Sequence, residues 1–436
     1  MNLAAKLEST LGAECVFQST TLNVDGCRPV VTVAPKTYEE VAEVLRFADI
    51  EGLKVLPFGT GTRLHIGNIP KKIDIALSTA RLNQVISYEP ADLTAIAEAG
   101  VPLVDFFART SANGQWLPVD PPGKGSTLGG VIATNAFGPL RTFYGTPRDY
   151  VIGLKIVAAD GTLIKTGGRV VKNVAGYDLN KLFIGSFGTL GVIVETAFKL
   201  RPVPESESTC LITSRSIEPL AAVANQVFKS QLLPISTLLT DSRALKVCDV
   251  PTGEAKWGLL VRFGDNRKSI DYQVHKLNEL VAEPNSIFQI LDYSTASRLW
   301  QAIADFEDVF ASEVTLRINT LPNRSAEMAT AAGSHLKKSG MSSASIVHTS
   351  SGVVHLYIKS ASENDAMTRR VLAMIEQLRA KVGDFGSLII ERAPLAIKQQ
   401  VDVWGQPRGT AALMRGIKEK FDPKATLIPG RYVAGI

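Results

Sequence analysis

Glycine is concentrated in one stretch of this 436-residue chain, and that stretch limits what the chain can fold around. Fourteen of the 35 glycines lie between residues 121 and 195, more than twice the share that an even spread would give. Gly185, Gly188 and Gly191 recur at a spacing of three, directly before an alternating run that indicates a strand. Because glycine has no Cβ, it lets the backbone approach a ligand closely or turn with a positive φ. The cluster therefore predicts a large flat or phosphorylated ligand held mainly by backbone groups.

The composition is that of an ordinary globular protein of two or three domains. The chain is 45% hydrophobic and 20% charged, and no apolar stretch reaches the length of a membrane span. The N-terminus has no apolar core of the kind that a signal peptide needs. The net charge of +5 arises without a dense basic run, so nucleic-acid binding is not indicated. The four cysteines are scattered, which fits a reducing cytoplasm and excludes a cysteine-ligated iron–sulfur cluster within this chain alone.

The pattern of strands and helices predicts an α+β fold with a boundary near residue 205. Strand and helix signals up to that point are followed by a Pro-Val-Pro break and a polar run. Residues 206–392 then show the order β-α-β-β-α-β twice, which predicts two ferredoxin-like units, either separate or sharing one sheet. A helix near residues 294–307 would join them. The tail, 393–436, ends in a Pro-Gly-Arg turn, and we expect either a surface loop or a segment that returns to the first domain.

Two glycine-rich loops fail the tests for the common nucleotide-binding motifs. PFGTGTR, residues 57–63, follows a strand and predicts an anion-binding turn, but Leu64 stands where a dinucleotide fingerprint needs its third glycine. PPGKGSTLGG, residues 121–130, contains Gly-Lys, but Pro118 and Gly125 occupy positions that a Walker A loop gives to Gly and to Ser or Thr. One elongated ligand that touches several loops explains this pattern better than several small sites.

The order of these motifs closely resembles the FAD-binding domain of the vanillyl-alcohol oxidase / p-cresol methylhydroxylase (PCMH-type) superfamily. The segments that carry the resemblance are PFGTGTR, STLGGVIATNAFGP, YGTPRDYVIGLKIVAADG, VVKNVAGYDLNKLFIGSFGTLGVIVE and FDPKATLIPGRY. Within that superfamily, VKNVAGYDLNKL, Val403-Trp404-Gly405 and the PGRYVAGI terminus are most similar to the FAD-binding subunits of bacterial glycolate oxidases. The resemblance implies a PCMH-type FAD-binding domain of two α/β subdomains over residues 1–205, a ferredoxin-like cap over 206–392, and a returning C-terminal segment.

The resemblance also implies which residues hold the cofactor. The expected FAD-binding residues are Gly59, Thr60, Gly61, Thr62, Ser126, Thr127, Gly129, Gly130, Arg148, Gly188, Thr189, Gly191, Ile193 and Arg431. Relatives with covalent flavin carry a His in the first loop, where this chain has Thr62, so we predict non-covalent FAD. The chain has Ile428 where many relatives have Asn before Pro-Gly. Lys172 and Tyr177 also lie in the signatures and either contact the ligand or order the fold.

The catalytic candidates lie in the cap region. Oxidation of a 2-hydroxy acid needs a cation for the carboxylate and a base for the hydroxyl proton. IVHTSSGVVHLYI supplies His348 and His355, which either act in catalysis or are partly exposed strand histidines that flank a hairpin without meeting. Arg317 is either a carboxylate clamp or part of a structural ion pair. No metal site is expected.

Three functions follow from the resemblance. The first is an FAD-binding subunit of a glycolate oxidase-type complex, which works beside a catalytic FAD subunit and an iron–sulfur subunit. The second is a stand-alone FAD-dependent 2-hydroxy-acid dehydrogenase of the D-lactate type. The third is a non-catalytic scaffold that keeps the fold for subunit contacts. For the first function we expect a cytoplasmic protein, or one peripheral to the inner membrane only through its partners.

Overall fold

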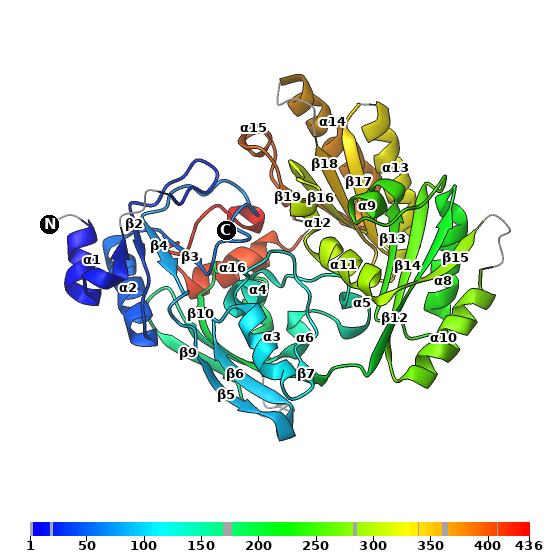
Figure 1. The fold of residues 1–436 in the computed structure, drawn as a ribbon. Helices are drawn as coiled ribbons and strands as arrows, with labels where there is room; N and C mark the ends of the chain where they lie inside the picture. The colour runs from blue at the N-terminus through cyan, green and yellow to red at the C-terminus, as the bar shows by residue number, and fades with distance from the viewer. Residues whose placement is uncertain are drawn as a thin grey trace. The chain divides into compact units, whose positions relative to one another are not determined.

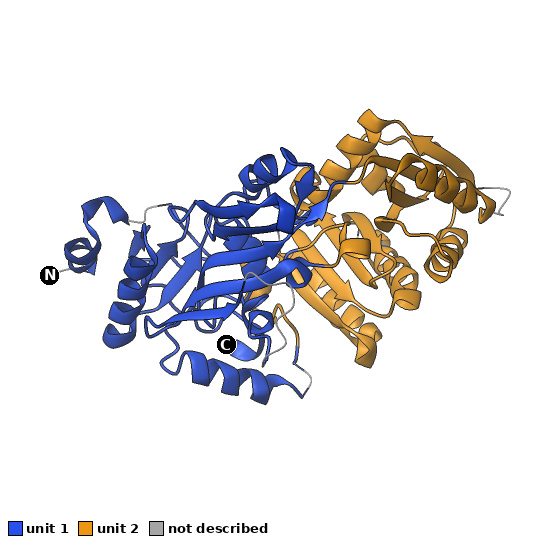
Figure 2. Ribbon diagram, turned by 90° about the horizontal axis from the view of Figure 1, so that it is seen from below, with its two compact units in different colours: residues 1–136, 146–203, 406–436 blue, residues 137–145, 204–405 orange. Residues whose placement is uncertain are grey.

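The computed structural model describes residues 3–17, 21–168, 177–281, 286–338, 340–359, 365–407 and 409–436 (Figure 1). The chain divides into two units, which Figure 2 shows in blue and orange. Unit 1 comprises Met1–Ala136, Thr146–Val203 and Gln406–Ile436, and unit 2 comprises Phe137–Gly145 and Pro204–Gly405. Residues 137–145 and 393–405 therefore pack with unit 2, although we expected them in the FAD-binding domain and in the C-terminal segment.

Unit 1 begins with a mixed sheet, in which only the pairings of β4 are parallel, and with one amphipathic helix. After α1 (Leu3–Leu11) and η1 (Ala13–Cys15), the first sheet contains β1 (Val16–Phe17), β2 (Val31–Val33), β4 (Ile75–Ser78) and β3 (Val55–Phe58) in this spatial order. Helix α2 (Tyr38–Glu51) buries Val41, Val44 and Leu45 on the face that packs in this core, because these residues recur at helical spacing. The Thr37 side chain caps α2 by accepting the Glu40 N–H at 3.1 Å, which fixes where the helix begins.

The second sheet of unit 1 is antiparallel. Its spatial order is β5 (Val85–Glu89), β6 (Thr94–Glu98), β10 (Val192–Lys199), β8 (Val151–Val157) and β9 (Leu163–Gly167). The other elements of unit 1 before residue 204 are η2 (Pro90–Asp92), α3 (Leu103–Ser111), β7 (Gln115–Trp116), α4 (Leu128–Thr134), α6 (Pro147–Tyr150), α7 (Asn180–Phe183) and β11 (Arg201–Pro202). The glycine-rich segments thus follow β3, precede and open α4, and precede β10.

The C-terminal segment returns to the first sheet of unit 1. Helix α16 (Ala411–Phe421) is followed by an extended stretch and by η5 (Val433–Gly435). The Val55 N–H donates to the Thr426 carbonyl at 2.8 Å, and the Ile428 N–H donates to the Val55 carbonyl at 3.0 Å. The tail therefore lies beside β3, the strand that leads into the first glycine-rich loop.

Unit 2 is built on one eight-stranded antiparallel sheet. Its spatial order is β15 (Ile287–Leu291), β12 (Ser206–Ser214), β14 (Trp257–Asp265), β13 (Ser236–Asp241), β17 (Ser342–His348), β18 (Val353–Lys359), β16 (Val314–Asn319) and β19 (Ser387–Arg392). Each half has the strand order of a ferredoxin-like unit, which confirms that prediction. The two halves share the sheet because β13 pairs with β17, with Leu239 opposite Val347.

Helices cover both faces of this sheet. The crossover helices are α8 (Ile217–Lys229), α10 (Arg267–Glu279), α13 (Ser325–Lys338) and α14 (Asp365–Val382). The other face forms a core with α9 (Ser242–Val247), α11 (Tyr293–Ala304) and α12 (Phe306–Val309), in which Leu299 and Phe306 pack with Leu238 and Ile346. The remaining elements of unit 2 are α5 (Arg141–Tyr144), η3 (Pro322–Arg324), η4 (Gly383–Phe385) and α15 (Leu395–Lys398).

Two contacts explain why the predicted segment limits differ from the units. Helix α5 packs against β13, which holds residues 137–145 in unit 2. The Ile390 N–H donates to the Val403 carbonyl at 2.8 Å, which ties the stretch after β19 to the edge of the same sheet. In the part of the chain that the structure describes, no helix is both long enough and apolar enough to cross a membrane.

We predict that Asp241→Ala weakens the shared sheet more than the loss of one helix cap would. The Asp241 carboxylate caps α9 by accepting the Ala244 N–H, and it also accepts the N–H and hydroxyl of Ser345 on β17 at 2.8 and 2.9 Å. The expected loss of unfolding free energy is about 2 to 4 kcal/mol. Asp292→Ala is the matched control, since Asp292 only caps α11, and its expected cost is about 1 kcal/mol. Equal losses in urea unfolding would contradict this account of the shared sheet.

Candidate functional site

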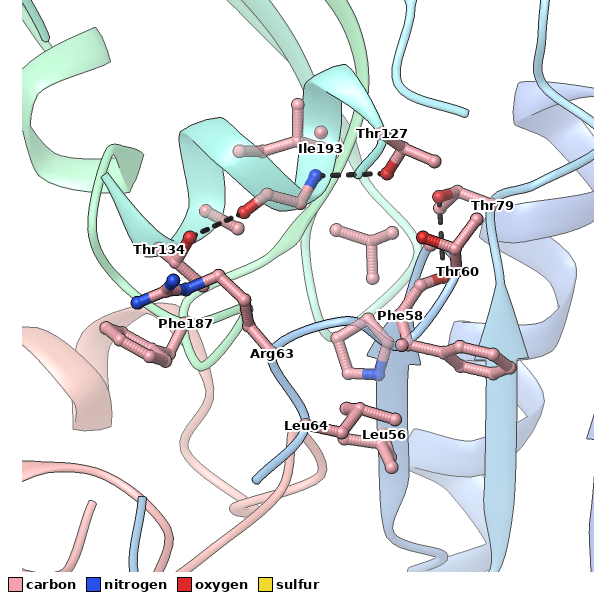
Figure 3. Close-up of a pocket in the computed structure, with 18 of the residues that line it drawn as sticks. Leu56, Phe58, Thr60, Arg63, Leu64, Thr79, Thr127, Thr134, Phe187 and Ile193 are labelled. Atoms are coloured by element: carbon pink, nitrogen blue, oxygen red, sulfur yellow. Dashed lines mark hydrogen bonds between the residues drawn. The ribbon is translucent and has the colours of Figure 1, made fainter. Parts of the chain in front are cut away.

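The glycine-rich loops of unit 1 surround a partly open pocket. Residues from five segments line it, namely 56–64, 79, 127–134, 187–193 and 431. In the view of Figure 3, Thr134, Arg63 and Phe187 lie on one side, with Thr60, Thr79 and Thr127 on the other. Of the predicted FAD-binding residues, those that line the pocket are Gly59, Thr60, Gly61, Thr62, Thr127, Gly129, Gly130, Gly188, Gly191, Ile193 and Arg431.

The first wall is the turn that follows β3. Among the described residues, the backbone N–H groups of Gly59, Thr60, Gly61 and Thr62 donate no hydrogen bond. Gly61 has a φ of 84°, a left-handed conformation that favours glycine. Consecutive N–H groups with no internal acceptor form a concave site for an anion. This turn therefore suits a pyrophosphate group.

The second wall is the start of α4, and it touches the first wall closely. A Cβ on Gly59 would lie 2.1 Å from the Thr127 hydroxyl oxygen, so no side chain fits there. The same Thr127 oxygen caps α4 by accepting the Gly130 N–H at 3.3 Å. The Thr60 hydroxyl donates to the Gly125 carbonyl at 2.8 Å. The two loops are thus held together by direct contacts and not only by a shared ligand.

The third wall is the turn before β10. A Cβ on Gly188 would lie 2.7 Å from Pro57, and one on Gly191 would lie 2.4 Å from Ile156. These glycines are therefore required by packing as well as by ligand approach. Phe187, which has a φ of 55°, also lines the pocket here.

Two arginines bring positive charge to the pocket. Arg63 closes the first loop, and Arg431 arrives from the C-terminal tail. Arg431 is 4% exposed, and burial lowers the pKa of its guanidinium to about 10, so it stays cationic at neutral pH. Backbone donors, two cations and apolar walls together fit a ligand with an anionic pyrophosphate and a flat ring system, which is the chemistry of FAD.

Three predicted FAD-binding residues lie outside the pocket. Ser126 is buried and donates to the Gly123 carbonyl, Thr189 donates to the Ser186 carbonyl, and Arg148 donates to the Lys181 carbonyl. Each side chain therefore orders a loop. Tyr177 is 98% exposed, and Lys172 lies outside the described residues.

Sequence reasoning missed several residues of the pocket. Arg63, Phe187, Thr79 and Thr134 line it without having been predicted. Arg63 and Phe187 lie inside the quoted motifs, and this location is the only feature of the sequence that indicates a role in the pocket. Ile428 is fully buried and packs with Val24, Leu56 and Ile73, so its side chain forms part of a hydrophobic cluster.

In unit 2, the sheet brings the three catalytic candidates together on one face. Arg317 on β16 is directly opposite His355 on β18, and His355 is opposite Ile346 on β17. His348 follows Ile346 by two residues and therefore projects from the same face. The rings of His348 and His355 meet edge to face with centroids 5.4 Å apart. The expectation that the two histidines flank a hairpin without meeting is wrong, because the register places them diagonally across adjacent strands.

A carboxylate that sequence reasoning missed completes this cluster. Glu391 on β19 forms an ion pair with Arg317, with one carboxylate oxygen 3.0 Å from the Arg317 Nε, and its other oxygen lies 3.6 Å from the His355 Nε2. No acid occurs between the two histidines in the sequence, and this one comes from a strand 36 positions after His355. Only the pairing of β16 with both β18 and β19 reveals the contact.

His348 is held neutral in this cluster. It is 4% exposed, so it is not a partly exposed strand histidine. Burial, followed by the nearby charges of His355 and Arg141, holds the pKa of His348 well below its ordinary value of 6.5. Among the described residues, its Nδ1 atom has no hydrogen-bond partner. A neutral imidazole with an unused ring nitrogen is able to accept a proton.

Phe137 is the hydrophobic centre of the same cluster. Its ring lies 6.3 and 6.5 Å from the rings of His348 and His355, measured between centroids. The guanidinium carbons of Arg141 and Arg317 lie 4.2 and 5.7 Å from the Phe137 centroid. Along the chain, Phe137 comes three residues after Thr134, which lines the pocket of unit 1.

We predict that Gly59→Ala weakens FAD binding at least tenfold. The added methyl group would displace Thr127 and so separate the two loops that hold the pyrophosphate. The matched control is Gly333→Ala on α13, where a Cβ meets open space. Titration of FAD into the apoprotein measures the effect, and unchanged affinity in Gly59→Ala would contradict the loop assignment.

We also predict that His348 makes the fold acid-sensitive. The histidine is neutral when folded and takes up a proton when unfolded below pH 6.5, so stability falls as the pH falls through that value. The expected slope is about 1.4 kcal/mol per pH unit. His348→Gln should remove this contribution to the slope of unfolding free energy against pH. His275→Gln should not, because the His275 side chain is 71% exposed. Identical slopes for His348→Gln and the wild type in urea unfolding between pH 5 and 7.5 would show that His348 is not the group responsible.

Comparison with known proteins agrees with this geometry. Residues 29–167 match the FAD binding domain family, and residues 203–432 match the family of FAD linked oxidases, C-terminal domain. Glycolate oxidase subunit GlcD of Bacillus subtilis is 27% identical over 421 residues, which cover 93% of this chain and 89% of the relative. The D-lactate dehydrogenase of Anaerostipes hadrus is 27% identical over 428 residues, which cover 93% of this chain and 89% of that relative.

A solved structure shares the fold. The crystal structure of p-cresol methylhydroxylase with substrate bound aligns with a TM-score of 0.76 and 16% identity, over 99% of this chain and 96% of that chain. Its fold confirms the PCMH-type architecture expected from the motifs. The chain therefore belongs to the FAD-linked oxidases and is an FAD-dependent oxidoreductase.

Proposed function

We propose that this chain oxidises glycolate or a related small 2-hydroxy acid to the 2-oxo acid. The observation that carries the proposal is the cluster of Arg317, His348, His355 and Glu391 on one face of the unit 2 sheet. A cation, a neutral base and an orienting carboxylate are the groups that a 2-hydroxy acid requires. The two relatives that act on such acids by name support the same substrate class.

Each residue of the cluster has a distinct proposed role. Arg317 binds the substrate carboxylate with its terminal N–H groups, while its Nε side is paired with Glu391. His348 accepts the hydroxyl proton, since it is neutral and its Nδ1 is available. Glu391 orients Arg317 and His355 together. When bound, FAD supplies the acceptor for the hydride that leaves the substrate carbon.

The residues that would hold FAD are those of the unit 1 pocket. The N–H groups of Gly59–Thr62 and the charge of Arg431 suit the pyrophosphate, whereas the third wall suits the adenosine side. We further propose that the flavin is bound non-covalently, since Thr62 occupies the position at which covalent relatives have a histidine.

We propose that the chain works as the FAD-binding subunit of a glycolate oxidase-type complex. The name of the Bacillus subtilis relative and the motifs of the tail support this assignment. Electrons would pass to an iron–sulfur subunit, because the cysteine spacing of this chain offers no cluster site, and the complex would include a second FAD subunit. The proposed place of action is the cytoplasm, with contact to the inner membrane through these partners.

A stand-alone D-lactate-type dehydrogenase is the second candidate. Its support is the Anaerostipes hadrus relative, which covers 93% of the chain. Anaerobic mixing of the purified holoprotein with glycolate or D-lactate separates the two. Rapid flavin reduction in the isolated chain supports the stand-alone enzyme, whereas reduction only with co-purified partners supports the subunit. No reduction in either preparation by any 2-hydroxy acid contradicts the proposed function.

We predict that Arg317→Met lowers kcat/KM for the hydroxy acid by on the order of 100-fold while FAD stays bound. The substitution removes the cation that is proposed to bind the substrate carboxylate. Arg262→Met is the matched control, because Arg262 is also a strand arginine of this sheet, bridged to Glu207 at 2.5 Å and lying over the Trp300 ring. Steady-state kinetics should show less than a twofold change in the control. A similar loss in both variants would indicate damage to the sheet and not the loss of a substrate contact.

A further inference from the structure

A buried ion pair lies behind the third wall of the FAD pocket. Lys418 on α16 is 7% exposed, and Asp422, just after the helix, is 2% exposed. The Lys418 Nζ donates to the Asp422 carboxylate at 2.5 Å, to the Thr189 carbonyl at 2.8 Å and to the Leu427 carbonyl at 3.0 Å. All three ammonium donors are therefore used.

Asp422 is equally well bonded. Besides Lys418, its carboxylate accepts the N–H groups of Thr426 and Leu427 at 2.8 and 2.7 Å. The pair thus fixes the turn that carries the chain from α16 into the returning segment. Both side chains point into protein and neither one contacts the FAD pocket.

The pair joins three of the parts of unit 1 that carry pocket residues. Thr189 lies between Gly188 and Gly191 of the third wall. Leu427 lies in the returning segment, whose neighbours bond to Val55 of β3 and so to the strand that leads into Gly59. Four residues beyond Leu427, the same segment supplies Arg431 to the pocket. One ammonium group therefore connects the first wall, the third wall and the cation.

A net gain in folding stability does not explain why this ion pair is buried. Taking two charges out of water costs about as much as their attraction returns, and apolar replacements of buried pairs are often neutral. Burial lowers the pKa of Lys418, and the Asp422 charge opposes that shift. The directional bonds to two carbonyl groups are what an apolar replacement cannot reproduce.

We propose that Lys418 and Asp422 are positioning residues for FAD: they hold the C-terminal segment and the Gly188–Gly191 turn at the spacing that the cofactor requires. FAD binding and docking of the C-terminal segment are consequently linked, so each one favours the other. The inference depends on FAD binding and does not depend on which acid is oxidised.

The double variant Lys418→Met/Asp422→Leu tests the proposal. It replaces both charges by apolar groups of similar length and removes the bonds to Thr189 and Leu427. The matched control is Lys424→Met, because Lys424 ties the same segment to Asp49 at 2.9 Å through a side chain that is 56% exposed. FAD affinity is measured by fluorescence titration of the apoprotein, and the melting temperature is measured on the apoprotein alone.

A positioning role predicts a split between these two measurements. We expect FAD affinity to fall at least tenfold in the double variant and less than twofold in the control, with a similar apoprotein melting temperature in both. FAD affinity within twofold of the wild type in the double variant overturns the proposal, whatever the melting temperature.

Hydrogen exchange on the wild-type chain keeps the proposal testable if the double variant does not fold. Addition of FAD should slow exchange in 59–62, in 186–193 and in 418–428 together. Protection of 59–62 without protection of 418–428 would overturn the linkage. Neither experiment uses a substrate, so failure of the proposed oxidation would leave both results interpretable.

Discussion

The close approach of Gly59 to Thr127 is the contact on which the cofactor pocket depends. Any side chain at position 59 would overlap the Thr127 hydroxyl, which at the same time caps α4. The turn after β3 and the start of α4 therefore come together only if residue 59 is glycine. The N–H groups of Gly59–Thr62 donate no hydrogen bond within the described residues, so this turn is available to bind an anion. Gly59 is therefore required by packing, and the packing of Gly59 against Thr127 forms the anion site.

Much of the fold was predictable because its signals are local. The side-chain cap of α2 at Thr37, the hairpin of β8 and β9 around Asp160-Gly161 and the twice-repeated β-α-β-β-α-β order all depend on residues close together in the sequence. The pairing of β13 with β17 was not predictable, since nothing local specifies which edges of two ferredoxin-like units meet. Tertiary contacts likewise decide that residues 137–145 pack with unit 2, and no local signal specifies it.

The same distinction between local sequence signals and tertiary contacts applies to the candidate sites. Motif spacing found most residues of the FAD pocket but also selected Ser126, Thr189 and Arg148, whose side chains bond to nearby carbonyl groups instead. Glu391 escaped notice because it joins Arg317 and His355 only through the pairing of β16 with β19. The Lys418–Asp422 pair escaped notice because a helical lysine four residues before an aspartate ordinarily indicates an exposed surface pair.

The proposed oxidation depends on FAD in the glycine-lined pocket of unit 1 and on a hydroxy acid at the arginine–histidine cluster of unit 2. A crystal structure of the chain with FAD and glycolate tests both placements directly. We expect the pyrophosphate at the N–H groups of Gly59–Thr62, with Arg431 beside it, and the glycolate carboxylate on Arg317 with its hydroxyl group toward His348. FAD bound away from these loops, or a carboxylate held without Arg317, would contradict the account.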